Sequence, residues 1–136
     1  MTWRPPHAYV PGHNARHTEG LFDQFGFDAR NIASSERWKL AIACLQEGYF
    51  WEAHELFEPI WLACPAGSLE KRLTQGLIQL ANAALKRRMQ RPNAVQRLQQ
   101  LAQELLTFDY HESMILGLNE EAVAQLWLDA FDEKMV

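Results

Sequence analysis

The chain has 136 residues, 48% of them hydrophobic, and a formal net charge of −4. A chain of this size and composition typically forms one globular domain that needs neither a disulfide nor a metal to fold. Its two cysteines form no CxxC pair, which excludes a zinc ribbon and a thioredoxin-type redox motif. It has no apolar signal segment and no apolar run long enough to cross a membrane, so we expect a cytoplasmic protein without a membrane partner.

Residues 1–33 are predicted to form an extended arm, because prolines at positions 5, 6 and 11 interrupt any long helix. Trp3 and Tyr9 make this arm too apolar for a solvated tail, so we expect it to lie against the helical body. A short amphipathic segment at residues 20–25 predicts one short helix near Leu21.

Residues 34–136 are predicted to form a single helical domain. A first helix begins at Ser34 or Ser35, both good N-caps, and ends at Gly48. A second helix covers residues 49–63, and Pro59 predicts either a kink or a restart of this helix. Ser68 caps a third helix over residues 69–89.

Pro92 opens the next helix, which ends near residue 106, and Asn119 caps the last one. No stretch alternates with period two for long enough to indicate a strand. The sequence therefore predicts an all-α fold: a compact antiparallel bundle of four main helices plus a short one, with an extended N-terminal arm.

The second predicted helix carries ionisable groups among aromatic residues. At about 100° per residue, and with His54 set to zero, Glu58 lies near +40°, Trp51 near +60° and Phe57 near −60°. His54 and Glu58 thus project from an aromatic stripe, whereas Glu52 points the opposite way. If the stripe is buried, these polar groups need partners.

We therefore predict a buried polar centre in which His54 and Glu58 meet amides of the third predicted helix. A neutral imidazole needs a donor and an acceptor, and a carboxylate beside a glutamine amide provides both. His54→Ala is then expected to cost about 1–3 kcal/mol through an orphaned partner. The candidate binding residues are His54, Glu55, Glu58 and Gln79, with His17 and Gln75 as supporting residues.

A metal-dependent or acid–base enzyme is the alternative interpretation. The pattern His54-Glu55-x-x-Glu58 resembles the HExxH motif of zinc proteases but lacks the second histidine, so we assign neither a metal nor a cofactor. Without a metal, His54 and Glu58 would form a minimal acid–base pair. The sequence contains no GxSxG nucleophile motif.

The charge is unevenly distributed, which suggests nucleic-acid binding as a further alternative. Residues 65–100 carry seven basic residues and one acid, whereas the remainder is strongly acidic. This segment contains no aromatic residue for base stacking, so a solvated face is the preferred interpretation. Its candidate basic patch consists of Arg72, Lys86, Arg87, Arg88 and Arg91.

Two segments at a characteristic spacing resemble the domain-of-unknown-function 309 family. They are Gly48-Tyr49-Phe50 with Glu52-Ala53-His54-Glu55, Glu58 and Trp61, and Gly76-Leu77-Ile78-Gln79-Leu80-Ala81. The resemblance covers roughly residues 38–118 and implies a small all-helical domain, chiefly bacterial and archaeal, without an established activity. It supports the importance of His54, Glu55, Glu58 and Gln79.

The leading interpretation is an intracellular binding or protein-interaction module organised by the buried polar centre, with an unidentified small-molecule ligand. Five tryptophans and seven phenylalanines exceed what a small helical core needs, and the chain also carries regions of opposite charge. We therefore expect a homodimer.

Overall fold

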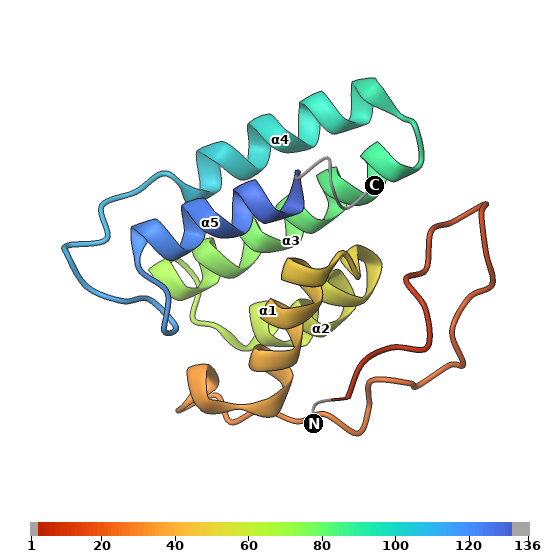
Figure 1. Cartoon of the computed structure of the whole chain (residues 1–136). Coiled ribbons are helices and arrows are strands. Elements are labelled where there is room, and N and C mark those ends of the chain that lie inside the picture. The colour runs from red at the N-terminus through yellow and green to blue at the C-terminus, as the bar shows by residue number, and fades with distance from the viewer. Residues whose placement is uncertain (1–2, 132–136) are drawn as a thin grey trace.

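The computed structural model describes residues 3–131, and within them it confirms the all-α fold, with five α-helices where four main helices were predicted (Figure 1). Within these residues the only β pairing is an isolated bridge between Ile115 and Leu118. The helices are η1 (Ile32–Ser34), a short 3-10 helix, and the α-helices α1 (Glu36–Glu47), α2 (Phe50–Ala63), α3 (Leu69–Arg88), α4 (Pro92–Leu106) and α5 (Glu120–Ala130).

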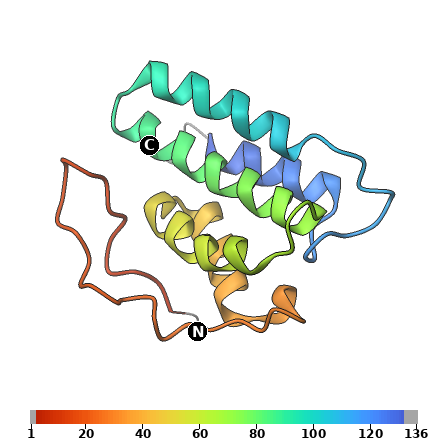
Figure 2. The same cartoon turned by 180° about the vertical axis from the view of Figure 1, so that it is seen from behind.

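The helices are arranged around α3, which packs against both α2 and α4. In both views α3, α4 and α5 group on one side of the molecule and the N-terminal arm lies on the other, with α1 and α2 between them (Figure 1, and from behind in Figure 2). The short connections make α1 and α2, and α3 and α4, neighbours in space. The largest fully buried side chains include Leu45, Leu56, Phe57, Ile60, Leu73, Leu77 and Leu80.

The predicted helix caps are confirmed. The side chains of Ser35, Ser68 and Asn119 each accept a hydrogen bond from a backbone N–H in the first turn that follows. Gly48 ends α1 with a φ of 87°, a left-handed conformation that favours glycine. The short helix expected near Leu21 is instead a series of turns, and the short helix that forms lies at η1.

The arm contacts the helices through aromatic rings and through hydrogen bonds. Within the arm, Trp3 packs against Phe22 and Phe25, whereas Tyr9 makes an edge-to-face contact with Trp51 of α2. Near the start of the arm, the Arg4 guanidinium pairs with Glu47 at the end of α1, with an N–O distance of 2.7 Å. The arm is extended, yet aromatic packing and an ion pair hold it to the first two helices.

Pro59 lies inside α2, which continues through it as one helix. Proline has no N–H, so the carbonyl of Glu55, four residues earlier, loses its usual helical donor. The guanidinium of Arg37 in α1 replaces it, donating to the Glu55 carbonyl at 3.2 Å and to the Leu56 carbonyl at 2.9 Å. Arg37 therefore satisfies the backbone that Pro59 leaves open.

The same guanidinium donates to two carbonyls of the arm, those of Phe22 and Phe25, at 3.1 and 3.0 Å. Four of its five N–H groups are thus used on backbone acceptors from two different segments. Arg37 joins α1, α2 and the arm at a single point.

Replacement of Arg37 by methionine should therefore lower the free energy of unfolding by about 2–3 kcal/mol, because buried carbonyls lose their donors. When Pro59 is also replaced by alanine, Arg37→Met should lower the free energy of unfolding by about 0.5 kcal/mol less, or by a still smaller amount. The reason is that an alanine at position 59 restores the N–H donor that the Glu55 carbonyl lacks. Urea denaturation measures both effects. Arg30→Met, at an exposed position of the arm, is the control. Strict additivity of Arg37→Met and Pro59→Ala would contradict the role of Arg37 as the donor that replaces the missing N–H of Pro59.

Gly76 sets the distance between α3 and α4. A Cβ atom at this position would lie 2.5 Å from Cδ2 and 2.7 Å from Cγ of Leu106, and 3.3 Å from Cβ of Leu105. Any side chain here must push α4 away or force Leu106 to move. The small residue is required by this close approach.

Gly76→Val should accordingly destabilise the fold by about 2 kcal/mol through overpacking, despite the higher intrinsic helix propensity of a non-glycine residue. Thermal unfolding monitored by circular dichroism tests this. Gly26→Ala, where an added Cβ meets nothing within 4 Å, should be close to neutral. Truncation of Leu106 to alanine should recover part of the Gly76→Val loss, and the absence of any recovery would refute the clash.

Candidate functional site

The buried face of α2 differs from the predicted one. Its buried residues are Phe50, Glu52, Ala53, Leu56, Phe57 and Ile60, a face centred about 100° away from His54. The prediction that His54 and Glu58 form a buried centre is therefore wrong: their side chains are 25% and 51% exposed. Small Ala53 and aliphatic Leu56 and Ile60 face the neighbouring helices, whereas Trp51 is only half-buried on the flank.

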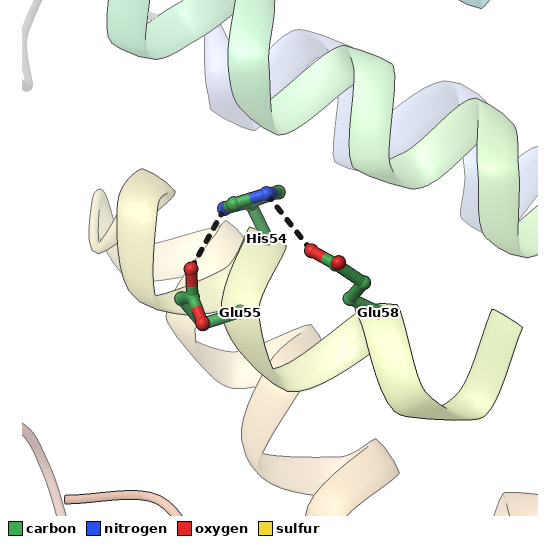
Figure 3. Close-up of side chains that lie close together, drawn as sticks. All are labelled: His54, Glu55 and Glu58. Atoms are coloured by element: carbon green, nitrogen blue, oxygen red, sulfur yellow. Dashed lines mark ion pairs between the residues drawn. The ribbon is translucent and has the colours of Figure 1, made fainter. Parts of the chain in front are cut away.

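His54 instead forms a partly exposed cluster with two carboxylates, those of Glu55 and Glu58 (Figure 3). Its Nδ1 lies 3.7 Å from Oε1 of Glu55, and its Nε2 lies 3.3 Å from Oε2 of Glu58. One ligand atom from each of the three residues lies within 4.8 Å of the other two. All three are candidate residues predicted from the sequence, and the structure brings them together on α2.

The glutamines of α3 are not hydrogen-bonded to this cluster. Gln79 accepts a hydrogen bond from Asn82 of its own helix at 3.3 Å. Both Gln79 and Gln75 are half-buried, and within residues 3–131 no hydrogen bond joins either of them to His54 or Glu58. The expected amide contact is thus absent from the described structure, and the imidazole of His54 is instead paired with Glu55 and Glu58.

The buried polar centre of the molecule is Glu52. Its side chain is fully buried, its Oε2 accepts the backbone N–H of Tyr9 at 2.7 Å, and the same oxygen lies 2.5 Å from Nε2 of His17. His17, whose side chain is only 3% exposed, was expected to support His54 but pairs with Glu52. Oε1 of Glu52 has no hydrogen-bond partner among the described residues.

The sequence prediction missed Glu52 because it took the aromatic side of the helix as the buried face, and Glu52 lies opposite to that side. If the side that carries Ala53, Leu56 and Ile60 is taken as the buried face, Glu52 lies at its edge and faces inward. Both partners of Glu52 belong to the arm: His17 lies 35 residues earlier in the chain and Tyr9 lies 43 residues earlier. No local pattern indicates such long-range contacts.

The two cysteines are free and buried. Burial raises the pKa of the Cys44 thiol to about 12, and the nearby Glu52 carboxylate acts in the same direction. Burial also raises the pKa of the Cys64 thiol. Both groups remain protonated at neutral pH, so neither has the thiolate character of a nucleophile.

Two members of the predicted basic patch bind helix ends. Arg72 donates to the carbonyls of Glu104, Leu105 and Thr107 at the end of α4. Arg88 donates to the Gly48 carbonyl at the end of α1, and its guanidinium carbon lies 4.5 Å from the centre of the Phe50 ring. These cations satisfy terminal carbonyls and complement the helix dipoles.

The other three cations of the patch are Lys86, Arg87 and Arg91, around the end of α3. The first two are half-buried and the third is exposed. In the part of the chain that the structure describes, none of the three forms an ion pair with an acid.

None of the helices within residues 3–131 is both long and apolar enough to cross a bilayer.

Comparison with known proteins yields one finding. Residues 38–98 match the family described as "Domain of unknown function (DUF309)". No curated protein and no solved structure matches the chain. The matched span runs from α1 into α4 and contains the His54 cluster, Glu52 and Gln79. Over these residues the chain matches the domain-of-unknown-function 309 family, which supports the resemblance seen in the sequence.

Proposed function

We propose that the domain is a binding module and that its ligand is a divalent transition-metal cation of the zinc type, held by the His54 cluster. The distance of 3.3 Å between Nε2 of His54 and Oε2 of Glu58 carries this proposal. Zinc binds histidine nitrogen and carboxylate oxygen at about 2.0–2.2 Å, so two neighbouring ligands of a tetrahedral ion lie about 3.4 Å apart. The two atoms already have nearly this separation.

Glu55 has a different position relative to the ring. Its Oε1 lies 3.7 Å from Nδ1, the nitrogen that points away from Glu58. Histidine ligands usually donate their second N–H to a carboxylate, which fixes the tautomer and the orientation of the ring. A small rotation of Glu55 would bring it within hydrogen-bond distance, so Glu55 acts as the orienting group.

The site would remain open to solvent. The two protein ligands are partly exposed, so further coordination positions would be left to water. A cation there would polarise that water, which is the chemistry by which metal sites support hydrolysis. The acid–base enzyme considered from the sequence would use the same pair of residues, and it stays a prediction.

Zinc titration of the untagged protein by isothermal calorimetry should detect one site. His54→Ala should abolish it, because the nitrogen ligand is lost, and Glu58→Gln should weaken it at least ten-fold. Glu55→Gln should weaken binding about ten-fold, the usual effect of removing an orienting carboxylate. Because His54 and Glu58 are partly exposed, all three variants should keep the melting temperature of the wild type within a few degrees.

The chain offers a matched control. His111 and Asp109 form another exposed histidine–carboxylate pair, with 3.4 Å between Nδ1 and Oδ2 and with side chains that are 73% and 75% exposed. His111→Ala should leave the zinc titration unchanged. Equal losses in His111→Ala and His54→Ala, or an unchanged titration in His54→Ala, would disprove the assigned site.

The remaining interpretations are supported less well. Arg72 and Arg88 are used at helix ends, which reduces the number of cations free to contact phosphates in a nucleic-acid complex. The homodimer stays a prediction. Among residues 3–131, the large apolar side chains with the greatest exposure are Leu62, Met114 and Leu128, at 64%, 64% and 63%.

A further inference from the structure

A groove runs between α4 and α5, two helices that lie on the opposite side of the molecule from the arm (Figure 1, and from behind in Figure 2). Two cavities, of about 460 and 380 Å³, form successive sections of it. Gln99 lines the first and Gln103 the second, one helical turn apart on α4. Across the groove, Phe131 lines the first and Trp127 the second, and their ring centres lie 5.4 Å apart. The start of α4 thus lies beside the end of α5, and the groove follows α4 for about 22 Å.

The two ends of this groove carry opposite charge. Where α3 ends and α4 begins, the charged lining residues of the described chain are Arg87 and Arg91, both basic. At the other end the charged lining residue is Glu120, at the start of α5. Within residues 3–131 none of these three side chains forms an ion pair. The cavity of about 550 Å³ beside His17, between the arm and α2, differs because its lining mixes three acids with two arginines.

The middle of the groove can pair with a copy of itself. Gln99 and Gln103 lie there on α4, and a primary amide carries both donors and an acceptor, so two such groups can hydrogen-bond to each other. Trp127, half-buried on α5, lines the groove together with Gln103. Aromatic rings pack favourably on one another. Neither kind of group requires a partner of different chemistry.

This order of charges makes the groove complementary to a second copy of itself. A two-fold axis through the middle of the groove exchanges its ends, so the basic end of each copy meets the acidic end of the other. The amides and the indole near the axis then meet their own counterparts. A groove with one sign of charge along its whole length would instead repel its own copy.

We propose that this groove is the surface through which two copies of the chain associate, in an antiparallel homodimer in which Arg91 of one protomer pairs with Glu120 of its partner. Each dimer then contains this ion pair twice, once at each end, and Trp127 supplies apolar contact near the axis. The inference stands apart from metal binding at His54, because none of the residues that line the groove belongs to α2.

Charge reversal tests this pairing. Arg91→Glu and Glu120→Arg each place like charges opposite each other at both ends of the dimer, so each should raise the dimer dissociation constant about ten-fold or more. Sedimentation equilibrium of the full chain over a range of protein concentrations measures this constant. Arg97→Glu is the matched control, because Arg97 is an exposed cation of the same helix outside the groove lining, and it should leave the constant nearly unchanged.

Mixing the two variants separates the interface from effects on folding. When Arg91→Glu pairs with Glu120→Arg, the introduced acid faces the introduced arginine, and the two unchanged residues face each other. Both ends are then complementary again, so an equimolar mixture should form a heterodimer with an affinity close to that of the wild type. Formation of this heterodimer would also show that both variants are folded.

Gln103→Glu tests the position of the axis. A carboxylate introduced near the axis meets its own copy, so this variant should also dimerise more weakly. Because Gln103 is exposed, its melting temperature should stay within a few degrees of the wild type.

Three results would overturn the proposal: a wild-type chain that is monomeric at every concentration, an unchanged dissociation constant in Arg91→Glu, or folded variants that fail to associate on mixing. Circular dichroism checks that each variant is folded. If Glu120→Arg is unfolded, Arg91→Glu and Gln103→Glu decide alone, and an unchanged constant in both refutes the interface. Failure of the zinc titration leaves these results unaffected, because the two experiments share no residue.

Discussion

The missing N–H of Pro59 is the constraint on which the first half of this structure depends. A proline inside a helix leaves a carbonyl without a donor, and an unpaired carbonyl in a buried region is costly. The guanidinium of Arg37 supplies two hydrogen bonds to α2 at this point and two more to the arm. One side chain thus fixes α1 against α2 and also determines where the arm lies.

Glu52 continues this organisation from within the core. A fully buried carboxylate requires partners, and both of those it has come from the arm: the Tyr9 N–H and the His17 imidazole. Since the arm lacks regular secondary structure, these contacts and its aromatic packing define its path. The cavity beside His17 follows from this path, because a segment held at separate points leaves space between them.

Charged groups divide between structural and binding roles according to their surroundings. Arg72 and Arg88 donate hydrogen bonds at helix ends, where the last carbonyls have no donor within their own helix. The carboxylates of Glu55 and Glu58 stay on the surface of α2, next to His54 (Figure 3). Glu55 belongs to this cluster and also lines the cavity between the arm and α2.

The sequence by itself determined the helical class, the caps at Ser35, Ser68 and Asn119, and the left-handed end of α1 at Gly48, because these features depend on neighbours within a few residues. It also identified His54 and Glu58 as a pair, since residues four apart share a helix face. Only the tertiary structure decided which side of α2 is buried. Trp51 and Phe57 both qualify as core residues by hydrophobicity, and packing against α1 and α3 selects between them. The pairing of Glu52 with His17 was likewise decided by the path of the arm, which no local periodicity encodes.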